Sequence, residues 1–266
     1  MINTRNQSLE ILKTNKLTLT ELAGRTCYNS EHKMHNNSAS QFVKNIVNSG
    51  HLSVIEHYTV CFKIFDAKLF KFLKQQKFIN CSEIHASGNL RAFYELNHPI
   101  INKMLHQIEP NIFNDTSIQK LEYYLSIEEN DSDLHKYLSV RIVCDRGISH
   151  EICRHRNNMA ISQSSQRYIK YDENIEFIIQ LGIETFEQRQ SWIYACSIAQ
   201  EIYLSLLQSG LKPEWSRSVL PNCTATTLIL TANIQQWKHI LKLRCSKAAH
   251  PQIAALFDPL KKELKL

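Results

Sequence analysis

Residues 154–168 read RHRNNMAISQSSQRY, and the rest of the chain is organised around this stretch. Three arginines, Arg154, Arg156 and Arg167, flank a run of serine and glutamine side chains. Guanidinium groups are planar bidentate donors that match phosphate, so the stretch predicts a site for an anionic ligand. The alternative is a solvated basic loop, and composition alone does not separate the two.

The order of residues in this stretch resembles the signature of the flavin-dependent thymidylate synthases. In that signature, Arg-His-Arg is followed seven or eight residues later by Ser-x-Arg-Tyr. Further blocks that occur in the family's order are Arg25 to Tyr28, Ser49 to His57, Arg217 to Pro221 and Asn233 to Arg244. By this resemblance the chain is identified as a member of the family.

Length and composition indicate one globular domain that spans residues 1–266. The chain has 43% hydrophobic and 21% charged residues, with a formal net charge of +6 that favours anionic ligands. Its eight cysteines include no C-x-x-C pair, which is typical of free thiols in a reducing compartment. No signal peptide and no apolar run of about 20 residues is apparent, so we expect a cytoplasmic protein without a membrane partner.

Periodicity predicts an α/β fold, with a mixed sheet flanked by long helices. The expected strands are 57–65, 137–144, 174–181 and 224–232. The expected helices are 40–49, with Ser40 as cap and Gly50 as the left-handed end, then a helix opened by residues 145–151, and helices at 184–209, 233–244 and 246–264. The helix at 184–209 is expected to bury a stripe that includes Phe186, Cys196 and Tyr203.

Residues 67–136 are expected to form an insertion, because the shortest family members pass almost directly from the first strand to the Arg-His-Arg helix. Helical spacing of apolar residues at 67–76, 88–106 and 115–138 predicts that the insertion is helical. Within it, the block Ser87 to Ala92 resembles one found in longer members.

Two histidine patterns invite a metal interpretation, and neither predicts a metal site. His51 and His57 are six apart and do not share a helical face, so a structural role is favoured. His150, Glu151 and His155 resemble a zinc-protease motif, but histidines five apart are turned about 140° from one another on a helix.

The resemblance implies a reaction and a set of ligands. The family forms dTMP from dUMP by methylene transfer from 5,10-methylenetetrahydrofolate, with reduction by FADH2 that NADPH regenerates. It also implies a homotetramer with sites shared between chains, and no essential cysteine. The alternatives are a catalytically impaired flavin- and nucleotide-binding relative and a basic helical protein that binds nucleic acid, and the stretch has little of the clustered basic character that the second requires.

The same resemblance assigns residues to the two main ligands. The dUMP residues are Glu151, Arg154, Gln163, Ser164, Ser165, Gln166, Arg167 and Arg217. The FAD residues are Ser53, Glu56, Arg154, His155, Arg156, Gln163, Asn233, Gln235 and His239. Arg244 and Ser165 are the expected catalytic residues, with Arg244 favouring ionisation of the uracil N3 position.

The family serine is ambiguous in this chain. The usual seven-residue spacing selects Ser164, whereas alignment on Ser-Gln-Arg-Tyr selects Ser165 and an eight-residue spacing. We favour Ser165, because its two-residue step to Arg167 directs both groups to one nucleotide. The extra residue is then expected as a bulge between 157 and 161. Gln163 and Gln235 also depart from the acidic residue and the arginine found at these positions in other members.

Overall fold

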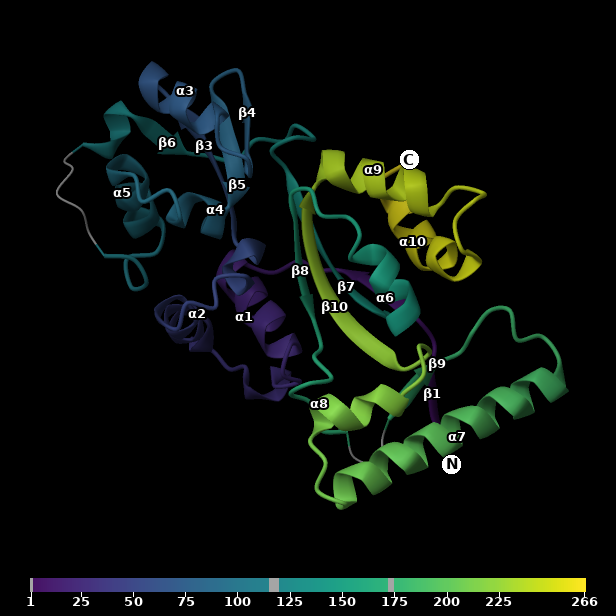
Figure 1. Ribbon diagram of the computed structural model, residues 1–266. Helices are drawn as coiled ribbons and strands as arrows, with labels where there is room; N and C mark the ends of the chain where they lie inside the picture. The colour runs from purple at the N-terminus through teal and green to yellow at the C-terminus, as the bar shows by residue number, and fades with distance from the viewer. Residues whose placement is uncertain (1, 115–119, 172–174) are drawn as a thin grey trace.

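A four-stranded antiparallel sheet forms the centre of the computed structural model, which describes residues 2–114, 120–171 and 175–266 (Figure 1). Its strands, in spatial order, are β2 (Ser8–Ile11), β7 (Tyr137–Asp145), β10 (Ala225–Asn233) and β8 (Met159–Gln163). The α/β class is confirmed. The expected mixed sheet is instead antiparallel, and a parallel pair is formed separately by β1 (Asn3–Arg5) and β9 (Glu176–Ile178).

Helices cover both faces of this sheet. Alternate residues of β10, such as Leu228 and Leu230, face a core shared with α6 (Arg146–Ile152), α9 (Ile234–Arg244) and α10 (Pro251–Glu263). The intervening Ile229 packs on the other face against α1 (Lys16–Thr26). The two-residue period of the strand therefore divides its side chains between two helical layers.

His57 joins the sheet to the loop before β3. It ends the short 3-10 helix η2 (Val54–His57), and its ring nitrogens lie 2.9 Å from Thr231 Oγ1 and 3.0 Å from Ser162 Oγ. The prediction that His57 is structural is confirmed, whereas His51 is exposed.

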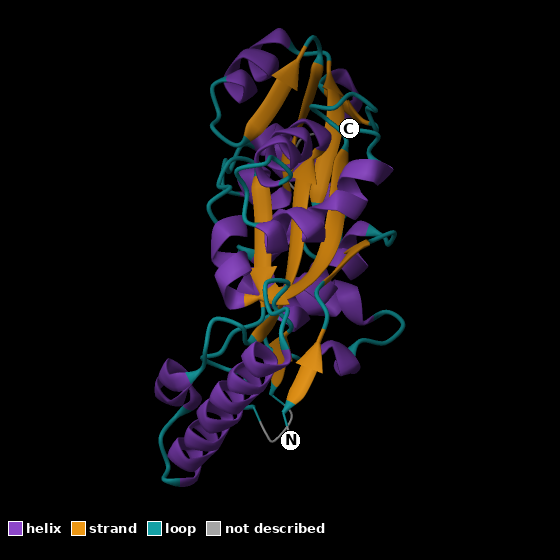
Figure 2. Ribbon diagram, turned by 90° about the vertical axis from the view of Figure 1, so that its right-hand side faces the viewer, coloured by secondary structure: helices purple, strands orange, loops and turns teal. Residues whose placement is uncertain are grey.

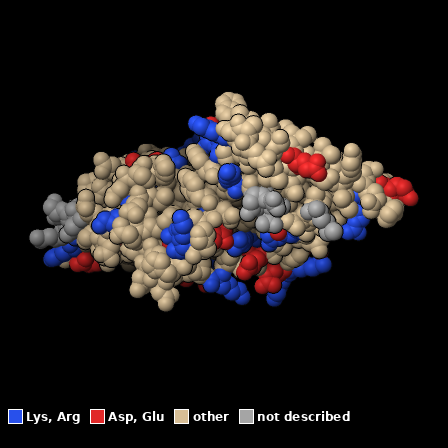
Figure 3. Space-filling model, turned by 90° about the horizontal axis from the view of Figure 1, so that it is seen from below, with Lys and Arg blue, Asp and Glu red and all other residues tan. Residues whose placement is uncertain are grey.

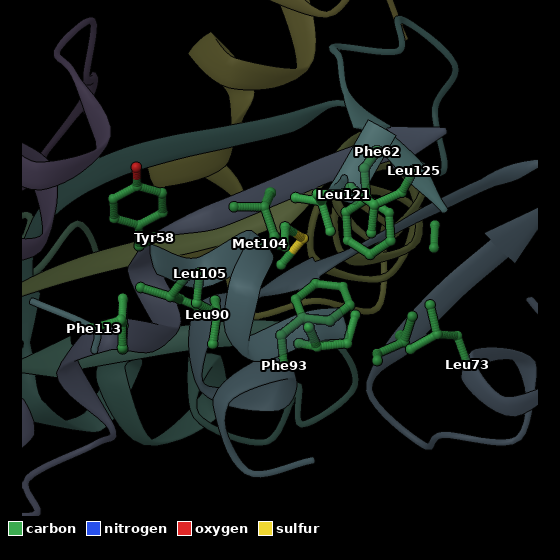
Figure 4. Close-up of a cluster of buried hydrophobic side chains, with 14 of the residues drawn as sticks. Tyr58, Phe62, Leu73, Leu90, Phe93, Met104, Leu105, Phe113, Leu121 and Leu125 are labelled. Atoms are coloured by element: carbon green, nitrogen blue, oxygen red, sulfur yellow. The ribbon is translucent and has the colours of Figure 1, made fainter. Parts of the chain in front are cut away.

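A second four-stranded antiparallel sheet has the order β4-β5-β3-β6. Its strands are β3 (Thr59–Ile64), β4 (Ile79–Ser82), β5 (His85–Asn89) and β6 (Leu125–Ile127). It packs with α2 (Ser38–Asn48), α3 (Ala67–Lys74), α4 (Leu90–Tyr94), α5 (Pro99–Ile108) and η3 (Leu121–Tyr123) around one core (Figure 4). Phe62, Phe93 and Met104 are fully buried there.

The prediction of a helical segment at 67–136 is therefore only partly correct. It holds for α3, α4 and α5, but residues 79–89 form the hairpin β4–β5 and residues 125–127 form β6. These strands are short and gain stability because β5 and β6 pair with β3 and β4 pairs with β5, which local spacing does not reveal. Residues 115–119 of the predicted helix at 115–138 lie outside the described residues.

The ends of α2 show how local signals set a boundary. Gly50 has a φ of +74°, as predicted for the left-handed residue after the helix. The predicted N-cap Ser40 is wrong, because α2 begins at Ser38 after Asn37, whose φ is +72°. The 3-10 turn η1 (Glu31–Lys33) precedes it.

Helix α7 (Phe186–Gln208) is the longest helix of the chain and extends along one end of the molecule (Figures 1 and 2). Thr185 and Gln188 form a capping box at its start. Cys196 and Tyr203 are buried as predicted, but Phe186 is 71% exposed and does not belong to the buried stripe. The chain then continues through α8 (Pro213–Ser216) and η4 (Arg217–Val219).

Among the helices of the described residues, none has the length and hydropathy required to cross a membrane.

Candidate functional site

The ends of α6 and α9 bring Glu151, His155 and Arg244 into contact. Arg244 Nη1 lies 2.7 Å from Glu151 Oε2, and Arg244 Nη2 donates to the Glu151 carbonyl oxygen at 2.7 Å. Arg244 Nε donates to His155 Nε2 at 2.9 Å. A guanidinium has five N–H donors, so two of them remain for a ligand.

His155 is held neutral in this cluster. Burial lowers the pKa of His155 to about 4, with further lowering by Arg244 and His239. Because Nε2 accepts from Arg244, the ring proton of neutral His155 is on Nδ1. The His239 ring lies edge-on, with its centroid 6.3 Å from that of His155.

A cavity of about 450 Å³ lies beside the start of α9, and three predicted flavin residues line it: Asn233, Gln235 and His239. Asn233 is buried because it caps the helix, with its Oδ1 accepting from Gln236 N at 2.8 Å and its Nδ2 donating to Leu134 O at 2.9 Å. Gln235 and His239 are exposed. The cap fixes where these two side chains project.

A second cavity, of about 290 Å³, adjoins the first, because Phe78 and Asn158 line both. Two predicted flavin residues, Glu56 and Arg156, line it together with Arg91. Glu56 Oε1 lies 2.8 Å from Arg91 Nη1. Burial raises the pKa of Glu56, and the bond from Arg91 opposes this effect.

At the C-terminal end of β8, Gln163 and Ser164 form hydrogen bonds with residues that the sequence did not predict to lie in the site. Gln163 Nε2 donates to Ser149 Oγ at 2.9 Å and to Thr226 Oγ1 at 3.1 Å. Ser164 Oγ lies 2.9 Å from Thr226 Oγ1, and Arg146 Nη1 donates to the Ser164 carbonyl oxygen at 3.2 Å. Ser164, Thr226 and Thr227 line a third cavity, of about 390 Å³.

The remaining nucleotide residues lie around this same end. Ser165 Oγ accepts from Arg167 N at 3.3 Å, and the Arg167 guanidinium lies 5.0 Å from the centre of the Tyr168 ring. Gln166 is buried, and Arg217 Nε donates to Glu214 O at 3.2 Å. Ser165 and Arg167 do not line the cavity to which Ser164 belongs.

The predicted nucleotide residues come from two segments of the chain. Glu151, which contacts Arg244, and the exposed Arg154 lie at and after the end of α6. Gln163 ends β8 and contacts Ser149 and Cys153 of that first segment, and residues 164–167 follow the strand. Ser53 is exposed at the start of η2 and lines none of these three cavities.

The predicted bulge between 157 and 161 is a turn rather than a break in the strand. Asn158 has a φ of +46°, and β8 then pairs with β10 in a continuous register from Met159 to Gln163. The left-handed residue immediately before the strand is where the backbone departs from regular geometry.

The residues of these sites that were not predicted include Arg91, Arg146 and Thr226. The only sequence signal was for Arg91, which lies in the block Ser87 to Ala92. Arg146 and Thr226 carry no local motif, and they reach the site because α6 and β10 begin beside each other.

The cysteines of this region are thiols. Burial raises the pKa of Cys27, whose carbonyl oxygen accepts from Ser165 N, and the pKa of Cys153, whose thiol contacts Gln163. Within the part of the chain that the structure describes, no group of three or more His, Cys, Asp or Glu residues is arranged to hold a metal ion.

Comparisons with known proteins identify relatives. The Thy1 family model, described as thymidylate synthase complementing protein, matches residues 10–84 and 104–266. A flavin-dependent thymidylate synthase from Geobacter sulfurreducens is 34% identical over 116 residues, which are 42% of this chain and 48% of that protein. One from Mycobacterium avium is 22% identical over 256 residues, which are 90% of this chain and 71% of that protein.

A similar solved structure is a UMP/dUMP methylase PolB from Streptomyces cacaoi bound with 5-Br UMP. It is 15% identical, with a TM-score of 0.46, over 98% of this chain and 90% of that one. The chain spans about half the length of the first relatives it matches by sequence.

The family match covers the residues of the three cavities except Arg5 and those in the interval 85–103, which includes Arg91 and lies inside the expected insertion. Residues 67–84 and 104–136 are matched. Since the match covers well over half of the chain, the protein belongs to the Thy1 family of thymidylate synthase complementing proteins.

Proposed function

We propose that this protein is an FAD-dependent thymidylate synthase that forms dTMP from dUMP. The carbon comes from 5,10-methylenetetrahydrofolate, and NADPH is the reductant. The observation that carries the proposal is the Thy1 match, which includes residues 53–56, 151–167 and 217–244. The names of the relatives support the same reaction.

Arg244 is proposed to act on the uracil. A guanidinium beside the imide stabilises the N3 anion, which increases electron density at carbon 5 without a covalent adduct to the enzyme. Glu151 and neutral His155 hold Arg244 in one orientation and leave two of its N–H groups for the pyrimidine. Arg154 contributes a further cation on the exposed side.

The two adjoining cavities are proposed to hold FAD. Lys77 and Arg156 provide positive charge for a diphosphate, while Asn233 and Gln235 provide amide groups and Phe78 an aromatic surface. This donor set fits the cofactor. Glu56, Ser53, His155 and His239 complete the proposed flavin residues. Bound FAD supplies the hydride chemistry, and the chain's residues bind and orient it.

Residues after β8 are proposed to anchor the nucleotide. Arg167 and Arg217 supply cations for its phosphate, and Ser164, Ser165, Gln163 and Gln166 supply neutral polar groups. Ser165 is the proposed catalytic serine.

We also propose a homotetramer in which each site is shared between chains. One observation supports it. Helix α7 presents Tyr194, Ile198 and Ile202 to solvent on the side opposite Cys196 and Tyr203. A helix with apolar residues on both sides is typically covered on both sides. The free thiols favour a cytoplasmic location, and the reaction requires neither nucleic acid nor a membrane.

The purified protein provides the test. We expect visible flavin absorbance and formation of dTMP that requires dUMP, methylenetetrahydrofolate and NADPH together. Flavin without turnover would indicate the catalytically impaired relative. Absence of both flavin binding and nucleotide binding would overturn the proposal.

A further inference from the structure

The orientation of the Gln163 amide is determined by its neighbour Ser149. Ser149 Oγ donates its only proton to the Arg146 carbonyl oxygen at 2.9 Å. Toward Gln163, also at 2.9 Å, Ser149 can therefore only accept. The side-chain atom of Gln163 that faces Ser149 must be the amide nitrogen, and this nitrogen also lies 3.1 Å from Thr226 Oγ1.

Thr226 is in turn left with one possible role toward Ser164. Its hydroxyl oxygen accepts from Gln163 Nε2 and, at 3.2 Å, from Arg146 Nη1. A hydroxyl has two acceptor positions and one proton, so the proton of Thr226 is directed to Ser164 Oγ at 2.9 Å. Thr226 is only 3% exposed, so water does not compete for this proton.

Ser164 is the end of this chain of donors. Its oxygen accepts from Thr226 and, at 3.2 Å, from the backbone N–H of Thr227. Both acceptor positions are used, and no hydrogen bond within the described ranges takes the Ser164 proton. Ser164 lines the cavity of about 390 Å³, together with Arg5, Arg141 and Lys170.

We infer that Thr226 is a positioning residue that makes the Ser164 hydroxyl a dedicated hydrogen-bond donor to an oxygen of the bound nucleotide. The identity of the ligand rests on the proposed function. Gln163 and Ser149 act further back in the same network, because they leave Thr226 no other direction for its proton. A hydroxyl that is oriented before binding loses less entropy when it meets its acceptor.

Binding of dUMP to the flavin-loaded protein, measured by calorimetry, tests this inference. We expect Ser164→Ala and Thr226→Val each to raise the Kd about tenfold, the loss of one hydrogen bond. The double variant should be no weaker than the weaker single variant, because Thr226 acts through Ser164. Thr226→Ser, which restores the hydroxyl, should bind within about twofold of wild type.

Additive losses in the double variant would overturn the inference, as would an unchanged Kd in Thr226→Val. Deoxyuridine, which lacks the phosphate, locates the acceptor. If only dUMP binding suffers in Ser164→Ala, the acceptor is a phosphate oxygen; if both ligands suffer, it belongs to the nucleoside. If Ser164→Ala binds both dUMP and deoxyuridine as tightly as wild type does, the donor role of Ser164 is contradicted.

Thr231→Val is the matched control. Thr231 lies in the same strand and is also 3% exposed, but its hydroxyl contacts His57 and Ser139. We expect this variant to lower the Tm and leave the Kd for dUMP unchanged. A raised Kd would show that any buried hydroxyl of β10 matters, and would reject a specific role for Thr226.

Urea unfolding without nucleotide separates this inference from the proposed function. If the network exists, Ser164→Ala and Thr226→Val should be non-additive in their effect on the free energy of unfolding. Additive effects would overturn the network even in an active enzyme. Non-additive effects in a protein that does not bind dUMP would retain the network and reject the proposed function.

Discussion

His57 illustrates, at the scale of a residue, how burial becomes a pH dependence. Burial lowers its pKa to about 3, whereas the unfolded chain titrates near the ordinary value of about 6.5. In this pH range His57 is protonated in the unfolded state and neutral in the native state, so the free energy of unfolding falls as the pH drops from about 6.5 toward 3. Between pH 7 and pH 5 this residue should cost about 2 kcal/mol of unfolding free energy.

Urea unfolding at the two pH values measures this cost. His57→Gln should remove most of the decrease that His57 causes, even if the variant is less stable at pH 7. His51→Gln, at an exposed position, should retain the decrease. An equal decrease in wild type and His57→Gln would contradict the assignment.

Arg244 and Arg217 should differ in steady-state kinetics. Arg244→Ala should lower kcat about a hundredfold, because its charge is proposed to act on the developing uracil anion. Arg217→Ala should raise the KM for dUMP about tenfold with a smaller change in kcat, because its proposed contact is the same before and during reaction. The opposite distribution of effects would reject both roles.

The Arg-His-Arg signature and the other family blocks allowed prediction of site residues that lie within them. Three of these residues, Glu151, His155 and Arg244, are in contact in the structure. It did not allow prediction of Arg146 or Thr226. Each matters through hydrogen bonds to residues 18 or more positions away in sequence. No local spacing encodes such a pairing, because the register of β10 with β8 creates it.

At the scale of an element, replacement of Gly50 measures how much the left-handed residue after α2 contributes to stability. Its φ is +74°, and an added Cβ would meet nothing within 4 Å. Gly50→Ala should therefore cost about 1–2 kcal/mol from backbone conformation alone. Gly182 also has open space around it and no positive φ, so Gly182→Ala should change stability by less than about 0.5 kcal/mol. Thermal unfolding of the pair checks the difference, and equal losses would contradict it.

Long elements with one dominant period were predictable, as β3, β7, β10 and α9 show. The hairpin β4–β5 was not. Its strands have four and five residues, and they turn through Glu83, a non-glycine residue with a φ of +50°. Strand β5 pairs with β3 and β4 pairs with β5, so the hairpin depends on a tertiary contact with a strand about 20 residues earlier in the chain.

At the scale of the whole molecule, the outer side of α7 is the feature that a single chain leaves unexplained. Tyr194 and Ile198 are 69% and 37% exposed, and Ile202 follows one turn later. The face seen in Figure 3 shows acidic and basic side chains interspersed over a surface that is mostly neither. Sequence periodicity assigned α7 one buried stripe and gave no separate signal for the apolar residues on its other side.

Replacement of Ile198 by glutamate tests whether α7 is covered by another copy of the chain. Wild type should sediment as a tetramer, whereas Ile198→Glu should form smaller species, because a carboxylate buried in an apolar interface costs several kcal/mol. Flavin content and turnover should fall together with assembly, since the sites are proposed to be shared. Circular dichroism should stay unchanged, because Ile198 lies outside the buried core.

Gln190→Glu introduces the same charge at an exposed polar position of the same helix. It should leave the tetramer intact, because the Gln190 side chain is polar and lies either in solvent or at the solvated rim of an interface, where a carboxylate is tolerated. If this variant also dissociates the assembly, charge on α7 rather than loss of apolar contact is responsible. A wild-type monomer that binds flavin and turns over dUMP would show that one chain completes the site.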